Sequence, residues 1–488
     1  MSTSRLFRGD FVHTPSLGSV EILRDYILRT NEKGYIDHFA PASLPESQSI
    51  SAIRRPTLIP TGSFMVPTFC DLHLHAPQFM YQGTGLHLEL MKWLDEYAFK
   101  AEEKLDGDLT LAEKVYTRLI QRLIMNGTGA VMLFGTIRTE TNLLLARLAQ
   151  EECPIRAFVG KLSMDISSRP TYVEATAEKS LAAAGDFCDR CIDMIRSLPE
   201  HMQLVEPVLT PRFVPTCSPA LLSGLGGLSE QKHVRIQSHM AEAHDQVQCV
   251  REERGEEDMD VFLHSNLLTS RTVQAHCTFL SPEDLRRLAA TGAAVAHCPL
   301  SNAYFSAEPF RLREALDAGV RVGLGTDIAG GYSIDIMDAM RHAVTVSRMR
   351  EGARIRASAN KERSRTDEDY GKPLFIDWKE ALYLATRGGA LALGLPEGCG
   401  TFAVGAPLDA QWIEIIDKGT GEGVGELDFF DLGDKLWDLT LDMVEKWWCL
   451  GTTQNRVGVW VQGTNVCWQA KGERPDEKST SNSATDEG

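Results

Sequence analysis

Short apolar runs alternate with longer amphipathic segments from about residue 69 onward. The runs are rich in β-branched and aromatic side chains, which favours buried strands. In the longer segments, such as residues 109–124 and 177–198, apolar residues recur every three or four positions, as they do on one face of a helix. We predict eight strands, at residues 69–75, 130–134, 155–160, 203–209, 234–239, 272–276, 293–297 and 320–325. Eight strands that alternate with helices indicate an α/β protein with a closed, TIM-like (β/α)8 barrel.

One helix start is well marked, between the sixth and seventh predicted strands. The segment Ser281-Pro282-Glu283-Asp284 offers a serine cap, a proline suited to the first helical position and acidic side chains that favour the helix dipole. We therefore predict a helix that begins after Ser281 and ends near Gly292.

Both ends of the chain differ from this central pattern. Residues 1–66 and 391–470 show strand-like alternation with glycine and proline turns, for example at 400–415 and 456–463. We predict that these two stretches meet in a small β-domain, while residues 67–390 form the barrel. Residues 471–488 are polar and charged, which predicts a disordered tail.

Composition excludes several classes of function. The 488 residues carry a formal net charge of −17, and nucleic acids and anionic membranes need a basic surface, so we expect neither as a partner. The first residues hold no apolar stretch of signal-peptide length, and no later run is long enough for a membrane span, so a cytoplasmic enzyme is expected.

The 11 cysteines are scattered along the chain. The pair Cys188 and Cys191 lies in a predicted amphipathic helix, which favours buried thiols over a zinc or redox site.

Histidines and one aspartate stand where predicted strands end. His73 and His75 are two residues apart, so both rings face the same side of the first strand. His239 ends the fifth strand, His276 ends the sixth, and Asp327 follows the eighth. The carboxyl ends of barrel strands converge on one face, where these five side chains could hold Zn²⁺ or Fe²⁺. Each residue alone could equally be a hydrogen-bonded polar side chain or a turn residue; their joint placement favours the metal site.

Two further residues lie at the same predicted barrel mouth. Glu242 follows His239 by three residues and could act as a general acid or base above the metal, or could simply begin a helix. His297 ends the seventh strand, and we favour a supporting or substrate contact for it over metal binding. The remaining histidines in polar surroundings are expected to be solvated: His233, His244 and His264.

The five strand-end residues together resemble the metal-dependent amidohydrolase superfamily. Within it, the segments around them resemble the guanine deaminase family more closely, and so does the N-terminal segment 6–13. The similar segments are 75–79, 210–213, 237–242, 296–302 and 323–332. The resemblance covers most of the chain except the polar tail. The chain departs from the family pattern before the first ligand, with Thr68 after Pro67 and with Cys70 in the strand.

The resemblance implies a barrel with a small β-sandwich built from both termini, a homodimer, and one Zn²⁺ ion per chain. The implied metal ligands are His73, His75, His239, His276 and Asp327. The implied catalytic residues are Glu242, Asp327 and His276. The implied substrate contacts are His75, Gln78, Arg212, Phe213, His239, Glu242 and Asp327. The fourth strand ends without a lysine that could bridge two metals as a carbamate, so a single ion is expected.

The implied reaction is the zinc-dependent hydrolysis of guanine to xanthine and ammonia, a step of purine catabolism or salvage. Glu242 would protonate a ring nitrogen, Asp327 would carry a proton from water to the departing amine, and His276 would orient the nucleophile. The alternatives are deamination of another purine, a pterin or a related nitrogen heterocycle, and a non-catalytic scaffold homologue. Only Gln78 and the pair Arg212 and Phe213 discriminate among substrates, and a scaffold has no need of the intact ligand set.

Overall fold

The computed structural model describes residues 4–359, 372–430 and 438–468, in two compact units. One unit combines Met1–His13, Val20–Thr68 and Pro396–Gly488, and the other combines Thr14–Ser19 and Phe69–Leu395. The predicted tail at 471–488 lies outside the described residues. None of the helices in the described ranges is long and apolar enough to cross a membrane.

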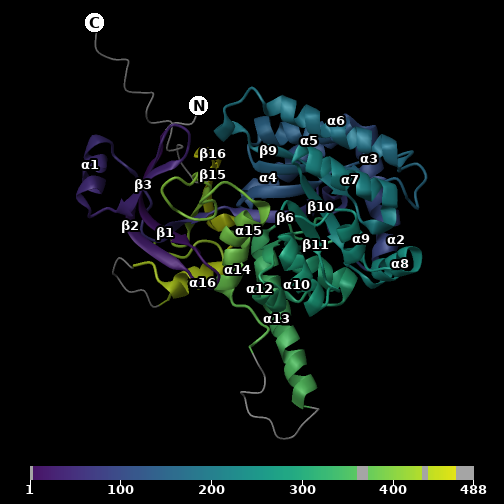
Figure 1. Cartoon of the computed structure of the whole chain (residues 1–488). Coiled ribbons are helices and arrows are strands. Elements are labelled where there is room, and N and C mark those ends of the chain that lie inside the picture. The colour runs from purple at the N-terminus through teal and green to yellow at the C-terminus, as the bar shows by residue number, and fades with distance from the viewer. Residues whose placement is uncertain (1–3, 360–371, 431–437, 469–488) are drawn as a thin grey trace. The chain divides into compact units, whose positions relative to one another are not determined.

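The larger unit is built on a sheet of eight parallel strands that follow one another in sequence order (Figure 1). Hydrogen-bonded pairs run from the first strand to the eighth, and each neighbour pair is parallel. The strands are β6 (Phe69–His75), β7 (Thr128–Phe134), β8 (Arg156–Ser163), β9 (Val205–Pro211), β10 (Arg235–Met240), β11 (Thr272–His276), β12 (Ala294–His297) and β13 (Arg321–Leu324). All eight predicted strands are thereby confirmed, with ends that differ by a few residues.

Backbone hydrogen bonds bring the first strand of this sheet to the segment that follows the last. The Asp327 N–H donates to the carbonyl of His73 at 2.8 Å, and the His75 N–H donates to the carbonyl of Ile328 at 2.8 Å. β6 and β13 also pack against each other. The eight strands therefore form a nearly closed barrel, and its carboxyl-terminal edge is the point where the ring of strands is completed.

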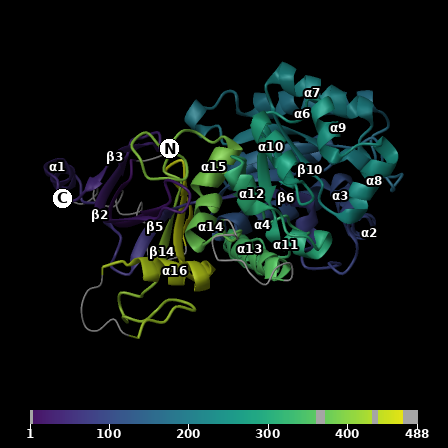
Figure 2. The same ribbon diagram turned by 60° about the horizontal axis from the view of Figure 1, so that its bottom comes forward.

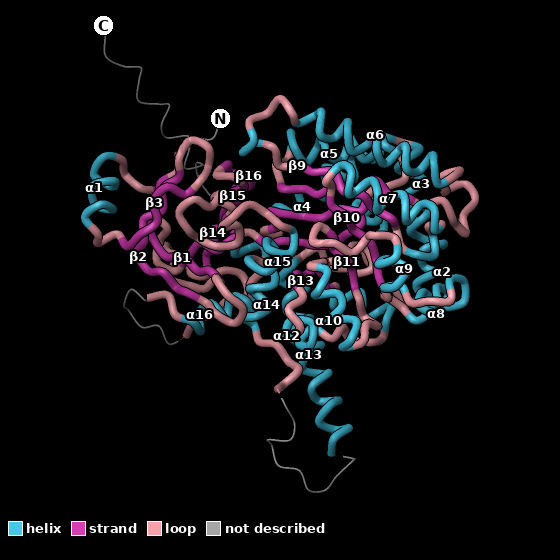
Figure 3. Tube along the Cα trace, in the orientation of Figure 1, coloured by secondary structure: helices cyan, strands magenta, loops and turns pink. Residues whose placement is uncertain are grey.

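Helices cover the outside of the barrel (Figures 2 and 3). Most lie between successive strands: α4 (Leu109–Met125), α5 (Thr139–Arg147), α6 (Ala177–Ile195), α7 (Pro219–Lys232), α8 (His244–Arg254), α9 (Asp258–His264), α10 (Pro282–Thr291), α11 (Pro299–Ser301) and α12 (Leu312–Asp317). Two more helices lie between β6 and α4, namely α2 (Leu90–Trp93) and α3 (Phe99–Gly107). Three helices follow β13: α13 (Ile336–Ala359), α14 (Trp378–Ala385) and α15 (Arg387–Leu393). Short 3-10 and π turns connect them: η1 (Ala76–Tyr81), η2 (Leu94–Ala98), η3 (Leu148–Glu152), η4 (Glu200–Met202), η5 (Val214–Thr216) and η6 (Asn302–Ser306).

The predicted helix caps are present. Ser281 caps α10 in a complete capping box with Asp284, and Gly292 ends the helix in a left-handed conformation (φ 72°) that glycine adopts without strain. The predicted helices at 109–124 and 177–198 are α4 and α6, capped by Asp108 and Thr176. Cys188 and Cys191 are free thiols buried in α6, as the sequence predicts.

The smaller unit is a mixed sheet made from both ends of the chain. β5 pairs antiparallel with β14, which joins the N-terminal strands to the C-terminal ones. The strand order is β16-β15-β14-β5-β1-β2-β3, with β4 beside β1. The strands are β1 (Leu6–His13), β2 (Glu21–Thr30), β3 (Ile36–Pro41), β4 (Thr57–Leu58), β5 (Ser63–Pro67), β14 (Ala410–Glu414), β15 (Arg456–Val461) and β16 (Thr464–Trp468). The sequence predicted this meeting of the ends but not the helices α1 (Pro45–Ile53) and α16 (Leu441–Leu450) or the 3-10 turn η8 (Thr453–Asn455).

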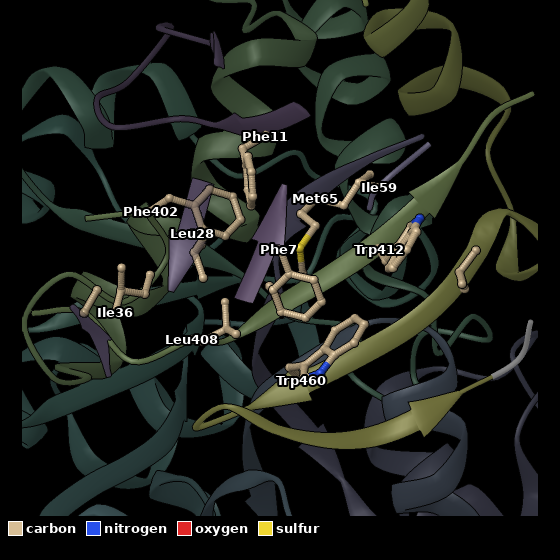
Figure 4. Packing of buried hydrophobic residues seen from close by; sticks show 13 residues of the cluster. Phe7, Phe11, Leu28, Ile36, Ile59, Met65, Phe402, Leu408, Trp412 and Trp460 are labelled. Atoms are coloured by element: carbon tan, nitrogen blue, oxygen red, sulfur yellow. The ribbon is translucent and has the colours of Figure 1, made fainter. Parts of the chain in front are cut away.

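Aromatic side chains form the core of the smaller unit (Figure 4). The Phe11 ring packs edge-on against Phe39 and against Phe402, each with centroids 5.2 Å apart. Phe7 meets Trp460 in the same way at 5.4 Å. These contacts join residues from the two ends of the chain, so the aromatic core stabilises the shared sheet.

We predict that Phe11→Ala destabilises the protein, because Phe11 is fully buried and its removal leaves a cavity between two aromatic rings. Such substitutions cost about 3–5 kcal/mol in the free energy of unfolding. Thermal denaturation measures the effect, and Phe430→Ala is the matched control because Phe430 is 89% exposed. Equal unfolding midpoints for the two variants would contradict this account of the core.

Candidate active site

The barrel brings the five predicted metal ligands together at the carboxyl ends of its strands. His73 Nε2 lies 3.0 Å from Asp327 Oδ1. His75 Nε2 lies 3.0 Å from His239 Nε2, and His276 Nε2 lies 3.8 Å from Asp327 Oδ2. Overlapping groups of three, with potential ligand atoms within 4.8 Å of one another, link all of these residues. Their side chains form one buried cluster although they come from β6, β10, β11 and the segment after β13.

Hydrogen bonds fix which nitrogen of two rings points into the cluster. His239 Nδ1 lies 2.7 Å from the carbonyl oxygen of Arg212, so Nδ1 carries the proton and donates it. His276 Nδ1 lies 2.9 Å from the side-chain oxygen of Asn302 and donates in the same way. Each ring therefore turns an unprotonated Nε2 toward the centre of the cluster.

The cluster fits a divalent metal ion. Within the described residues, Nε2 of His73 and Nε2 of His276 are buried without a hydrogen-bond partner, which is costly unless something else binds their lone pairs. The Nε2 atoms of His75 and His239 also face each other. Several imidazole nitrogens beside one carboxylate form a donor set that suits ions such as Zn²⁺ or Fe²⁺.

Burial keeps the imidazoles neutral. Loss of solvent, followed by the influence of neighbouring rings and of Arg212, lowers the pKa of His75 well below its usual value. Burial likewise lowers the pKa of His73 and of His239. The ring of Phe134 contributes to this dry environment, since its centroid lies 4.6–4.9 Å from three of the histidine rings. Neutral imidazole is the form that binds metal.

Asp71 supports the cluster from the first strand, a role the sequence did not reveal. One carboxylate oxygen accepts from the backbone N–H of Thr326 at 3.0 Å and of His73 at 3.2 Å. The other accepts from the Thr326 hydroxyl at 2.5 Å. Burial raises the pKa of Asp71 to about 7. Asp71 thereby joins β6 to the segment that carries Asp327, and its position two residues before His73 on the same strand face was the available signal.

Glu242 lies beside the cluster in a position suited to proton transfer. Its Oε1 is 3.5 Å from His276 Nε2. The backbone around it is held by the side chains of Gln246 and Ser306, which bond to its N–H at 2.9 Å and to its carbonyl at 2.5 Å. Burial, and then the charge of Asp327, raise the pKa of Glu242 well above its usual value. A raised pKa favours the protonated carboxyl group, which is the form that can act as a general acid.

A cavity opens beside the metal ligands, with about 340 Å³ of space between atoms, some of it open to solvent. We call it the first cavity. All seven predicted substrate contacts line it: His75, Gln78, Arg212, Phe213, His239, Glu242 and Asp327. The other described lining residues, which the sequence did not indicate, are Leu90, Trp93, Leu94, Phe305 and Gly330.

An ion pair at one wall of the first cavity orients two of the polar residues. Arg212 donates to both oxygens of Glu102, at 2.7 and 3.0 Å, and all of these groups are buried. The Gln78 amide nitrogen approaches Glu102 at 3.5 Å, and its oxygen accepts from the Ala329 N–H at 3.2 Å. Burial alone would lower the pKa of Arg212, but the charge and hydrogen bonds of Glu102 raise it instead. Glu102 lies on the amphipathic helix α3, where nothing in the sequence distinguishes it.

Two aromatic rings face each other at another part of this wall. The centroids of Trp93, from α2, and Phe305, from η6, are 5.1 Å apart. Phe213 lines the cavity close to His239, with centroids 6.3 Å apart. Flat apolar surfaces of this kind suit an aromatic substrate ring.

The other histidines lie elsewhere. His297, for which a supporting or substrate contact was predicted, is buried but lines a second cavity instead of the first. The three histidines that were expected to be solvated are exposed, on or next to surface helices: His233, His244 and His264.

The Amidohydrolase family model matches residues 64–466, and the chain therefore belongs to the amidohydrolase family. More narrowly, it is similar to guanine deaminases. It is 35% identical over 469 residues to guanine deaminase of Homo sapiens, which covers 95% of this chain and 96% of that protein. It is 33% identical over 475 residues to guanine deaminase of Dictyostelium discoideum, which covers 95% and 98%. The resemblance predicted from the sequence is confirmed.

A solved structure extends the comparison to the fold. Guanine deaminase from C. acetobutylicum, with guanine bound in its active site, superposes with a TM-score of 0.80 at 27% identity. The match covers 95% of this chain and 100% of that one. The barrel and the sheet made from both ends of the chain thus occur together in both proteins.

We predict that Glu102→Gln strongly destabilises the protein, because it leaves the buried Arg212 without a counter-charge. Removing one partner of a buried pair costs about 3–5 kcal/mol in the free energy of unfolding. Glu103→Gln is the matched control, since its bond with Arg169 joins side chains that are 31% and 30% exposed. An exposed pair of that kind contributes about 1 kcal/mol or less. Thermal denaturation of the two variants measures the difference in stability. Similar unfolding midpoints would contradict a structural need for Glu102.

Proposed function

We propose that this chain is a zinc-dependent guanine deaminase that hydrolyses guanine to xanthine and ammonia. The observation that carries the proposal is that Glu242, Gln78 and Arg212 line the same cavity as members of the buried histidine and aspartate cluster. Full-length similarity to guanine deaminases supports the choice of guanine over other heterocycles.

Guanine would lie flat in the first cavity. The Arg212 guanidinium uses two of its donors on Glu102 and keeps others for a carbonyl oxygen of the substrate. The Gln78 amide can donate to the same edge of the ring, because its oxygen already accepts from Ala329. Phe213 offers an apolar surface to the purine face. Together these groups would recognise a flat ring that carries a carbonyl and N–H groups.

We assign one Zn²⁺ ion per chain to His73, His75, His239, His276 and Asp327. The single ion is supported by the absence of a lysine at the end of β9, which ends at Pro211 and is followed by Arg212. When bound, such an ion lowers the pKa of a water molecule toward neutrality, which supplies a nucleophile near C2 of guanine.

The side chains supply the proton transfers. Glu242, whose pKa burial raises, donates a proton to a ring nitrogen, which makes C2 a better electrophile. Asp327 accepts a proton from the attacking water and passes it to the departing amine, and burial of its carboxyl group, which raises its pKa, makes it a better base. His276 lies between Glu242 and Asp327, at 3.5 and 3.8 Å, and orients the water. Ammonia leaves when the bond between C2 and the amine breaks, and the proton of the hydroxyl group left on C2 returns to Glu242 as the carbonyl of xanthine forms.

Two features implied by the resemblance stay predictions: a homodimer and a cytoplasmic location. Light scattering of the purified protein measures the first, and microscopy of a tagged chain measures the second.

We predict that the zinc-loaded protein releases ammonia from guanine and that Glu242→Gln lowers kcat by at least about a hundredfold, because general acid catalysis contributes that much. The glutamine keeps the shape of the side chain but has no acidic proton. Coupled ammonia detection gives the rates, and Glu253→Gln, an exposed glutamate on α8, is the control. Turnover of a pterin or another purine with guanine inert would overturn the substrate. Full activity in Glu242→Gln would overturn the role of Glu242.

We also predict that the purified protein holds about one zinc ion per chain, as expected for a site with one set of ligands. His239→Ala removes a ligand from the middle of the cluster and should lose most of the metal, whereas His233→Ala, on the exposed end of α7, should keep it. Elemental analysis of dialysed protein measures both. Equal zinc in the two variants would place the metal elsewhere.

A further inference from the structure

A second cavity lies in the larger unit, behind the wall of the first. The space between atoms in this second cavity is about 1080 Å³, some of it open to solvent. One side is a single face of α13, where Val346, Met349, Arg350 and Ala353 lie three or four residues apart. The opposite side is the chain that follows β12, including Phe310. Figures 1 and 3 show that α13 extends outward from the barrel, so its distal half is left without covering helices in the described chain.

Two buried polar side chains point to a ligand in this cavity. His297 and Asn302 both line it and are each only 2% exposed. His297 Nδ1 and Asn302 Nδ2 have no hydrogen-bond partner among the described residues. The other side of the Asn302 amide is occupied, because its oxygen accepts from His276. Buried polar atoms without partners are rare in folded proteins, and two of them on residues that line one cavity point to a polar group that binds there.

The chemistry of the lining restricts that group. Asn302 Nδ2 can only donate, so the ligand must carry an acceptor. Burial, with His276 nearby, lowers the pKa of His297 to about 3, so its ring is neutral and can bond to a neutral head group. Among the charged residues of the lining, Arg350 is paired with Glu314, and Arg356 and Glu308 carry opposite charges, so the lining adds no net positive charge. A neutral alcohol or amide therefore fits better than an anion. Phe310, Val346 and Met349 offer apolar surface to the rest of the molecule.

One short segment separates the two cavities. Within η6 (Asn302–Ser306), Phe305 lines the first cavity and Asn302 lines the second. The same segment touches the catalytic residues, through Asn302 on His276 at 2.9 Å and Ser306 on the carbonyl of Glu242 at 2.5 Å. A molecule that bonds to Asn302 from behind therefore acts on the group that orients His276.

We propose that the second cavity is an effector site for a small neutral molecule with an apolar body and an alcohol or amide head, and that its occupation changes turnover in the first cavity through η6. The effector bonds to Asn302 Nδ2 and His297 Nδ1, and its body packs against α13. The coupling rests on the proposed function; the binding does not, so the two can fail separately.

Benzamide is a suitable probe, because it combines an aromatic body with an amide head. We expect saturable binding to the zinc-loaded full chain with a Kd on the order of 1 mM, typical of a ligand with few atoms, by saturation-transfer NMR. His297→Phe keeps the ring but removes its nitrogens, and should weaken binding by about fivefold or more. In guanine assays benzamide should change kcat, since a molecule in the second cavity does not exclude the substrate.

Two tryptophan variants locate the probe. Ala353→Trp fills the second cavity from α13 and should abolish both benzamide binding and its effect on kcat, while turnover without benzamide stays unchanged. Thr345→Trp, exposed on the same helix but outside the cavity lining, should keep both. Competitive inhibition that persists in Ala353→Trp would put benzamide in the first cavity and overturn the site. Binding that Ala353→Trp abolishes, with kcat and KM unaffected by benzamide, would overturn the coupling. No binding up to about 10 mM would overturn the whole proposal.

Discussion

The removal of water from the ionisable groups at the barrel mouth is the constraint on which the rest of the site depends. Loss of solvent lowers the pKa of His73 and His239, which favours neutral rings with free lone pairs, and it raises the pKa of Glu242, which favours its protonated form. The same dryness requires a counter-charge for Arg212, which Glu102 supplies. One physical cause thus acts on the proposed metal ligands, on the proposed general acid and on the ion pair at the wall of the first cavity.

The sequence predicted the parts of the protein that depend on local pattern. Period and composition located all eight barrel strands, and the strand-end positions of His239, His276 and Asp327 placed them correctly on one face. Asp71 and Glu102 were missed because their importance comes from partners far along the chain, Thr326 and Arg212, and an isolated acidic residue carries no such information. The aromatic pair Trp93 and Phe305 of the first cavity was missed for the same reason.

The η6 segment lies between the two cavities of the larger unit and contributes residues to both. Its outward residues line a broad cavity against α13, and its inward residues touch the groups beside the metal ligands. A wall that is only one helical turn thick transmits small shifts, because side chains on its two sides cannot move independently. The proposed coupling therefore depends on the position of α13, which no sequence pattern predicted as a cavity wall.

The bond between Asp71 and Thr326 joins residues that are 255 positions apart. During synthesis the first strand of the barrel leaves the ribosome long before the last. Most of the barrel is therefore made before the histidines of β6 can meet Asp327. An ion that needs both ends of this span cannot guide the early steps of folding; it binds the finished barrel and stabilises it by mass action. Supply of the metal ion would then govern how long the folded protein persists in a cell, and not whether the chain finds its fold.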